Sequence, residues 1–277
     1  MAKDLIIVRA GKSSLHHSWF NRDNSPRSWE LLVCPYEDIP PQPAGISGLL
    51  VSDVIDAPAK WKGLKILLNE WPEWHDYRYV LLADDDLFAS QQTWSRFFDR
   101  CAQFGAKHAQ PGLLENSYFS HSVTVRNTEF VARRVSYVEV MMPCFRTDIL
   151  PEMLATFDLS ESGEGWGIDF LWSKKLGYKD VFVIDETPVL HTRSLRSHAN
   201  PGLHRTLNDE MTKIMRDNQV PWLLKTFAGI LPSGEEIAEG HAAFLYRLFR
   251  GYERMFAQDP RRFDELIRLQ LAPSPAG

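Results

Sequence analysis

Three consecutive carboxylates, Asp84-Asp85-Asp86, are the residues of this sequence best suited to chemistry. They follow the apolar run Tyr79-Val80-Leu81-Leu82-Ala83 directly. Three adjacent acids repel one another unless a positive group lies among them, and their oxygens are hard ligands that suit Mg²⁺ or Mn²⁺. The stretch therefore predicts a divalent-cation and phosphate site. The alternative is a solvated acidic turn before a helix, where acids are also favoured.

The element that must position these acids is a short buried strand, because an apolar run of this length before turn residues is typical of one. In an open α/β sheet, ligands bind beyond the carboxyl ends of the strands. Along the chain, similar strand-like runs alternate with segments whose apolar residues recur at helical spacing. This alternation of strands and helices predicts an α/β fold. The expected strands are 5–8, 29–34, 49–56, 120–126, 135–142 and 181–185, and the expected helices include 60–71 and 94–104.

Two basic features could contact the anionic part of a ligand. Arg9 and Lys12 lie in a small polar loop after the first expected strand, and the alternative is an exposed basic turn. The helix that starts near Lys60 carries several lysines, Lys65 among them. They could face a pyrophosphate, although solvent is the more frequent place for such lysines.

A second unusual stretch is Gly163-Glu164-Gly165-Trp166-Gly167, followed by Asp169. Glycines permit unusual dihedrals and close backbone approach. The alternative is a tight loop that enters a helix. Later in the chain His191 follows two apolar residues, and a histidine in such a place is more often structural than a metal ligand.

Glu139 lies within an apolar alternating stretch, and a carboxylate in such a place needs a partner. A structural pair with Arg133 or Arg134 is the simplest expectation.

Composition excludes several classes of protein. The chain has 277 residues, 44% hydrophobic and 24% charged, which is ordinary for a globular protein with one large core. The net charge of −5 argues against non-specific nucleic-acid binding. The three cysteines form no metal-spacing motif, which favours a reducing compartment. Because there is no long apolar run and the chain begins with a strand, we expect a cytoplasmic protein.

After residue 200 the pattern becomes helical. We therefore expect a catalytic domain over 1–200 and a helical C-terminal extension over 201–277. Residues 241–271 carry six arginines beside large apolar residues. They could form an amphipathic packing helix or contact a membrane surface or a partner.

The order of these pieces resembles the nucleotide-sugar glycosyltransferases of the GT-A fold, whose acidic Asp-x-Asp motif binds a metal. More narrowly, residues 77–191 are similar to the uncharacterised family DUF707. The resemblance covers about 40% of the chain. The similar pieces are 79–87, Gln110-Pro111, 121–126, 138–143, 165–169 and 183–185 with His191.

The resemblance implies a GT-A-like, Rossmann-related fold with a mixed, mostly parallel sheet flanked by helices. It also implies a hexosyltransferase-type enzyme that depends on Mn²⁺ or Mg²⁺. Such an enzyme moves a sugar from a nucleotide-diphosphate donor to a carbohydrate or glycolipid acceptor.

Roles for individual residues follow from the same resemblance. Asp86 would bind the metal, Asp84 the metal or the donor's ribose, and His191 would complete the coordination. Asp85 would be the variable middle residue of the donor site, and Trp166 would stack on a sugar unless it packs in the core. Arg9 and Lys65 are the basic candidates for contact with the donor.

Asp169 matches the acid that deprotonates the acceptor in several inverting relatives. Those relatives often carry two adjacent acids, whereas this chain has Asp169-Phe170.

Two other classes of function remain open at this point. One is a metal-dependent nucleotidyltransferase or phosphohydrolase. The phosphohydrolase would carry an Asp-x-Asp-x-Thr/Val nucleophile motif, whereas Leu87-Phe88 follow the acids in this chain. The other is a non-catalytic carbohydrate-binding protein on the same fold.

Overall fold

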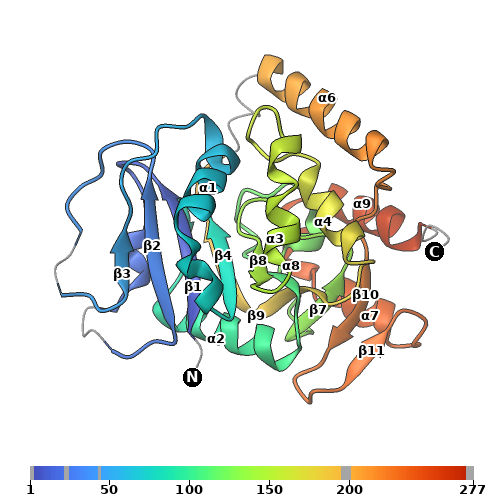
Figure 1. The fold of residues 1–277 in the computed structure, drawn as a ribbon. Helices are drawn as coiled ribbons and strands as arrows, with labels where there is room; N and C mark the ends of the chain where they lie inside the picture. Colours follow the sequence, from blue (N-terminus) through green and yellow to red (C-terminus); the bar gives the residue numbers. More distant parts are fainter. Residues whose placement is uncertain (1–2, 22–24, 43–44, 195–200, 273–277) are drawn as a thin grey trace.

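A computed structural model describes residues 3–21, 25–42, 45–194 and 201–272. Its centre is one sheet with the strand order β11-β10-β7-β9-β6-β8-β4-β1-β2-β3, and β5 pairs with β9 (Figure 1). The strands are β1 Asp4–Ala10, β2 Trp29–Pro35, β3 Leu49–Val51, β4 Tyr79–Ala83, β5 Leu87–Phe88, β6 His108–Leu113, β7 Ala132–Val135, β8 Cys144–Arg146, β9 Val181–His191, β10 Thr226–Ile230 and β11 Glu236–Ala238. The α-helices are α1 Ala59–Glu70, α2 Gln91–Gln103, α3 Leu150–Leu154, α4 Ile168–Lys175, α6 Pro201–Asp217, α7 Phe244–Arg250, α8 Glu253–Gln258 and α9 Arg261–Leu271, with short 3-10 helices at His16–Trp19, Pro72–Asp76, Ser122–Thr124 and Phe157–Leu159.

The predicted fold class, a mixed α/β sheet flanked by helices, is confirmed. Parallel pairing joins β3, β2, β1 and β4 in a row and also joins β6 to β9. Antiparallel pairs bring β8 between β4 and β6 and add β7, β10 and β11 beyond β9. The parallel row is the part that carries the acidic triplet at its edge.

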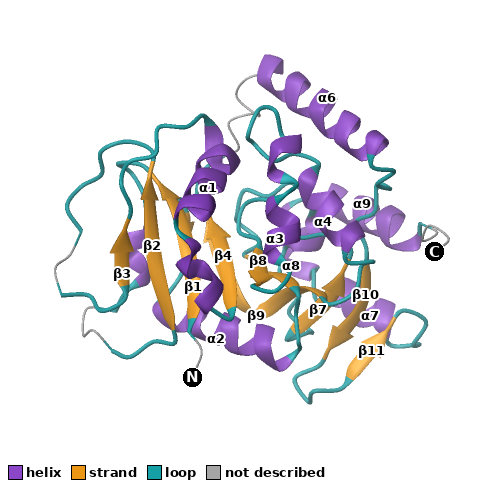
Figure 2. Cartoon of the chain, viewed as in Figure 1, coloured by secondary structure: helices purple, strands orange, loops and turns teal. Residues whose placement is uncertain are grey.

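Helices cover both faces of this row of strands (Figure 2). Alternate residues of β1 point to opposite faces, as a strand requires: Ile6 and Val8 pack in one core cluster, and Leu5 and Ile7 in another. The first cluster contains the apolar side of α2, and the second contains α1, α3 and α4. Because both faces of these strands are buried, their sequences are continuous apolar runs.

Strand β4 is held at its start and leads straight into the acids. All five residues of β4 are buried between β1 and β8. The Tyr79 hydroxyl donates to the carbonyl oxygens of Cys101 and Ala106, each at 3.0 Å. Beyond the strand, the Asp84 amide donates to the Met141 carbonyl at 3.0 Å. The backbone on both sides of the first acid is therefore fixed.

Three expectations about the later chain are wrong. Residues 120–126 form a 3-10 turn and loops, and only the start of 135–142 is in a strand, because β7 ends at Val135. The segment after 200 is not only helical, since β10 and β11 extend the central sheet next to β7. The expected domain boundary at residue 200 lies outside the described residues. Strands from before residue 195 and from after residue 200 belong to the same sheet.

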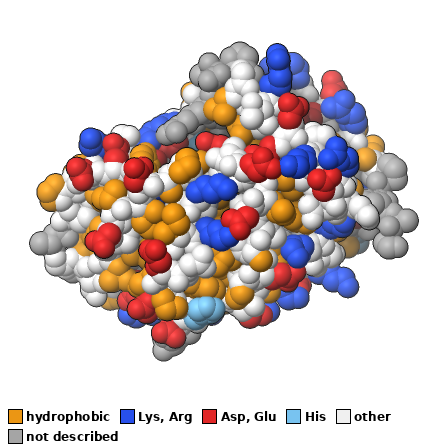
Figure 3. Space-filling view, turned by 45° about the horizontal axis from the view of Figure 1, so that its top comes forward, with side chains coloured by type: hydrophobic (Ala, Val, Ile, Leu, Met, Phe, Trp, Pro, Cys, Tyr) orange, Lys and Arg blue, Asp and Glu red, His pale blue; other side chains and the backbone are white. Residues whose placement is uncertain are grey.

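Four of the six arginines in the C-terminal helices form ion pairs with acidic residues. Arg247 and Arg250 pair with Glu129, and Arg261 and Arg262 pair with Asp259. On the face shown in Figure 3, Lys and Arg side chains are interspersed with Asp and Glu. Among the described residues, no helix combines the length and the hydrophobicity that a bilayer crossing requires. Contact with a membrane surface stays a prediction.

Candidate active site

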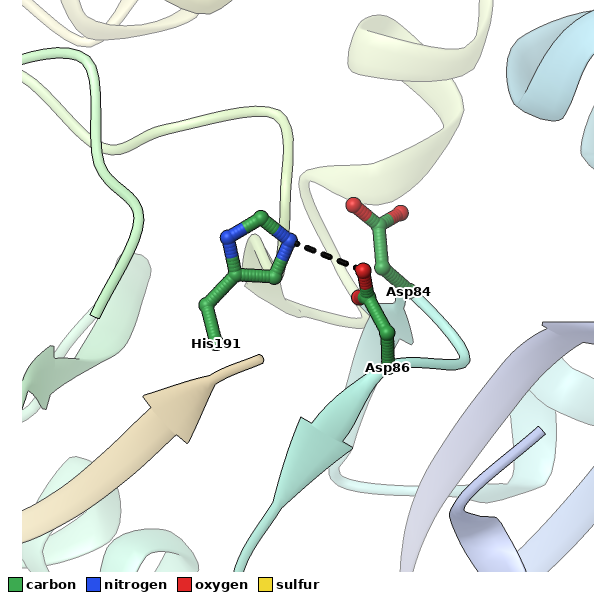
Figure 4. A group of neighbouring side chains, drawn as sticks. All are labelled: Asp84, Asp86 and His191. Atoms are coloured by element: carbon green, nitrogen blue, oxygen red, sulfur yellow. Dashed lines mark ion pairs between the residues drawn. The ribbon is translucent and has the colours of Figure 1, made fainter. Parts of the chain in front are cut away.

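Asp84 and Asp86 of the acidic triplet meet His191 beyond the carboxyl end of β4 (Figure 4). β5 follows the acids and pairs with the end of β9, which places Leu87 opposite His191. His191 Nε2 lies 3.2 Å from Asp86 Oδ2. One ligand atom from each of Asp84, Asp86 and His191 lies within 4.8 Å of the others, and they are the one such group found among the described residues.

Two observations show that these residues fit a divalent cation. Asp86 Oδ1 is buried and has no hydrogen-bond partner, as a metal-binding oxygen would be without its metal. His191 Nδ1 faces the Tyr118 carbonyl at 2.7 Å, which turns Nε2 toward the acids. Two carboxylates and one imidazole form a donor set that suits Mn²⁺ or Mg²⁺.

The charges around His191 favour its protonated form. Burial works to lower the pKa of His191, but the hydrogen bond to Asp86 and the charges of Asp86 and Asp84 outweigh it and raise the pKa to about 9. The protonated ring then donates to Asp86. Metal binding must release this proton.

Each of the other two acids also has a cationic partner. Lys60 Nζ lies 2.8 Å from Asp84 Oδ1 and donates to the carbonyls of Val140 and Met141. Burial raises the pKa of Asp84 and lowers that of Lys60, and the attraction between the two groups opposes both shifts. Arg193 lies 3.3 Å from Asp85. The negative charge of the triplet is therefore partly offset by two cations, of which Arg193 has N–H donors left for phosphate oxygens.

A cavity of about 330 Å³ opens over this cluster. Its walls come from the ends of the parallel strands, the start of α1, the glycine-rich loop and α6. A volume of this order holds a ligand the size of a nucleotide fragment. Besides the three ligands, the lining includes Arg9, Tyr36, Lys60, Asp85, Glu164, Trp166, Arg193 and Leu207.

The glycine-rich loop is built to present Glu164 and Trp166 to this cavity. Gly163, Gly165 and Gly167 all have φ between +77° and +94°, a region that side chains strongly disfavour. A Cβ at Gly165 would also overlap the Trp61 indole. The loop begins at Ser160, whose hydroxyl donates to Glu210 of α6 at 2.8 Å and accepts from the Gly165 amide at 2.9 Å.

The predicted basic residues have different outcomes. Arg9 lines the cavity, but its guanidinium donates to the carbonyls of Pro35, Ile55 and Ala57, so its described contacts hold the neighbouring loop. Lys65 does not line the cavity and pairs with Asp158. Its assignment to the donor site is wrong, because it lies about 140° around the helix from Lys60.

Asp169 is brought near the site but not into the cavity. It is 4% exposed, and its carboxylate accepts from the Tyr137 hydroxyl at 2.7 Å and from the amides of Gly167 and Phe170. These contacts fit an acid that caps the first turn of α4. The acid of this stretch that lines the cavity is Glu164, and this corrects the assignment of the acceptor base to Asp169.

Replacement of Asp169 by Asn should change how stability depends on pH. Burial raises the pKa of Asp169 to about 7, against the hydrogen bonds from Tyr137 and the amides. Between about pH 4 and pH 7 the folded protein therefore retains a proton that the unfolded chain releases, so this residue lowers stability as the pH rises. Asn cannot titrate. The stability of the variant relative to the parent should increase across this window, by a few kcal/mol at most at about 1.4 kcal/mol per pKa unit.

Thermal or urea unfolding of both proteins at pH 5 and pH 8 measures this difference. Parallel pH curves for the two proteins would show that Asp169 carries no shifted pKa.

Four site residues were missed or left open by sequence reasoning. Lys60 was not distinguished from its neighbours on the helix, and Arg193 carried no motif beyond its place two residues after His191. Tyr36 follows the second strand and could have been found from the rule that ligands lie beyond strand ends. Glu164 was visible as one of two acids around the loop.

A larger depression of about 770 Å³ lies over α2 and the middle of β9. Three of its charged side chains pair with one another, since Arg96 and Arg100 both bind Glu186. No metal-ligating cluster lies in it among the described residues.

Comparison with known proteins found no matching family model and no matching curated protein. Solved structures give weak likenesses. The S. aureus TarS 1–349 structure in complex with UDP-GlcNAc has a TM-score of 0.48 and 15% identity, covering 94% of this chain and 76% of that one. Another TarS 1–349 structure has a TM-score of 0.44 and 15% identity, covering 75% of this chain and 65% of that one. A197 from STIV has a TM-score of 0.39 and 12% identity, covering 86% of this chain and 94% of that one.

This chain thus spans about two thirds of the TarS 1–349 structure in the second match. Because these TM-scores are below 0.5, we derive neither fold nor function from the likenesses. The resemblance to DUF707 stays a prediction.

Proposed function

We propose that this protein transfers a sugar from a nucleoside-diphosphate donor to a hydroxyl of a carbohydrate or glycolipid acceptor, with Mn²⁺ or Mg²⁺ as cofactor. One observation carries the proposal. Three side chains that could hold a cation, two cationic side chains and the acid and tryptophan of a glycine-rich loop converge on a single cavity. The ordered motifs that resemble GT-A glycosyltransferases support the same conclusion.

The donor half of the site combines the three acids with two cationic side chains, so a bound divalent ion would supply its excess positive charge. A bound divalent ion would act as a Lewis acid and template that offsets charge on the diphosphate. Asp84, Asp86 and His191 are the residues that would hold it. Lys60 and Arg193 line the same cavity. The Arg193 guanidinium can donate to phosphate oxygens in addition to Asp85. The three N–H donors of Lys60 are engaged by Asp84 and by the carbonyls of Val140 and Met141, so Lys60 contributes its positive charge.

The acceptor half of the site needs a base and a surface for a sugar. Glu164 takes the proton of the acceptor hydroxyl as its oxygen forms the bond to the anomeric carbon. The bond from that carbon to the diphosphate breaks, and the leaving diphosphate keeps the electron pair. The Trp166 ring, held edge-on by His204 at 5.4 Å, offers an aromatic face for a sugar ring.

Product analysis tests this function against its rivals. The protein is incubated with Mn²⁺, with UDP-, GDP- and ADP-linked sugars and with a panel of sugar acceptors. The products are identified by mass spectrometry. We expect release of a nucleoside diphosphate and a gain of one sugar mass on an acceptor or on water. Release of inorganic phosphate alone would indicate a phosphohydrolase, and donor binding without turnover would indicate a binding protein.

A further inference from the structure

Glu139 is a buried carboxylate that the proposed chemistry does not use. It is 2% exposed. The expected pairing with Arg133 or Arg134 is wrong, because Arg133 binds Asp185 and Arg134 binds Glu236, each at 2.8 Å. Among the described residues Glu139 has no ion pair with Lys or Arg. A buried acid without such a partner is costly, so its remaining contacts need an account.

Those contacts fix one turn of the chain. One Glu139 oxygen accepts from the Ser120 amide at 3.2 Å, and the other accepts from the Thr124 hydroxyl at 3.2 Å. From the other side, the Glu139 amide donates to the Gln110 side-chain oxygen at 2.6 Å. Glu139 therefore ties residues 120–124 to Gln110 in the middle of β6.

The same stretch of chain holds His191 by three hydrogen bonds. The Tyr118 carbonyl faces His191 Nδ1 at 2.7 Å, and the Tyr118 amide donates to the His191 carbonyl at 3.2 Å. The Ser117 hydroxyl accepts from the His191 amide at 3.1 Å. Tyr118 is two residues from Ser120, so a shift of the turn that Glu139 fixes would move the carbonyl that orients the imidazole.

We propose that Glu139 is a positioning residue for His191, acting through residues 117–124 to keep Nε2 aimed at the site between Asp84 and Asp86. Partners that hydrogen-bond a ligating histidine fix its tautomer and orientation, and their loss commonly weakens metal binding 10- to 100-fold. Here the carbonyl of Tyr118 is the direct partner, and Glu139 holds the loop that carries it. The inference rests on the proposed metal role of His191.

The test separates hydrogen bonding, charge and simple stability. Glu139→Gln keeps an oxygen for the Ser120 amide and places its NH₂ against the Thr124 hydroxyl, which can accept, while the charge is lost. Glu139→Met has a similar volume and neither contact. Mn²⁺ affinity is measured by electron paramagnetic resonance on folded protein, with Glu129→Gln as a control for loss of an acid away from the site. We expect affinity within about threefold of the parent for Glu139→Gln and Glu129→Gln, and about tenfold or more weaker for Glu139→Met.

Unchanged affinity in Glu139→Met would overturn the proposal, and so would an equal loss in both Glu139 variants, which would assign the effect to charge. If Glu139→Met does not fold, Thr124→Val decides in its place. It removes the Thr124 contact of Glu139 together with the 2.8 Å hydrogen bond from the Thr124 hydroxyl to the His121 carbonyl, both of which hold the same turn. A loss clearly larger than threefold supports the proposal, and affinity within about threefold of the parent overturns it.

A metal-free readout keeps this inference distinct from the proposed function. In a crystal structure of Glu139→Met without metal, we expect the contact between His191 Nδ1 and the Tyr118 carbonyl to be broken. An intact contact would overturn the positioning role. If the parent protein binds no Mn²⁺, the proposed function fails, and this crystal structure still decides whether Glu139 positions His191.

Discussion

Replacement of Asp86 by Asn should weaken Mn²⁺ binding by about 100-fold or more, equivalent to about 2.8 kcal/mol. Asp86 carries the one ligand oxygen that is buried without a partner, and its other oxygen faces His191 Nε2 at 3.2 Å. Asn keeps the shape of the side chain but removes the negative charge and replaces one oxygen with a donor group. Titration of free Mn²⁺ by electron paramagnetic resonance measures the change.

Asp85→Asn is the matched control, because it removes the same charge one residue away. Asp85 accepts from the Gly11 amide at 2.9 Å and pairs with Arg193, and it is not among the clustered ligands. We expect its Mn²⁺ affinity to stay within about fivefold of the parent. Equal losses in the two variants would mean that overall charge, and not ligation by Asp86, governs the affinity.

Replacement of Glu164 by Gln should lower the rate of sugar transfer by about 100- to 10,000-fold, the usual contribution of a positioned base. Glu164 lines the cavity with the cation cluster, and three glycines with positive φ hold its loop. Gln has the same size and cannot accept the proton. Release of nucleoside diphosphate under saturating donor measures the rate, and Mn²⁺ affinity should be unchanged because Glu164 is not among the clustered ligands.

Asp169→Asn is the control for this prediction. The structure places Asp169 behind Tyr137 with its oxygens engaged, so we expect transfer within about threefold of the parent. The reverse pattern, with the rate lost in Asp169→Asn and retained in Glu164→Gln, would contradict our assignment. It would show that Tyr137 moves aside when substrates bind and that Asp169 is the base.

The N-terminal half of the fold could be predicted because its strands are buried on both faces. Two apolar runs, Leu5-Ile6-Ile7-Val8 and Tyr79-Val80-Leu81-Leu82-Ala83, are uninterrupted, which is typical of central strands covered on both faces. The later stretches 120–126 and 135–142 alternate without forming full strands, since side-chain contacts such as those of Glu139 hold them in turns. Local patterning does not contain these contacts, which join residues far apart in the chain.

The grouping of Asp84, Asp86 and His191 was predicted from the resemblance to GT-A glycosyltransferases, and the topology of the sheet explains why the three residues meet. Asp84 and Asp86 leave the end of a strand, and His191 ends the strand that β5 pairs with, so topology alone brings them together. The choice between Lys60 and Lys65 depends on the rotation of one helix, and the choice between Glu164 and Asp169 depends on the path of one glycine loop. Sequence spacing does not determine either of these geometries.

The most direct test of the central claim is whether metal and nucleotide bind as one unit. The melting temperature of the protein is measured with Mn²⁺, with a nucleoside diphosphate, and with both, because ligands that bind the folded state raise it. We predict that the nucleotide raises the melting temperature substantially only when Mn²⁺ is present, and that Asp86→Asn abolishes this dependence. A nucleotide effect of equal size in Mn²⁺ and in excess EDTA would contradict a metal-dependent diphosphate site.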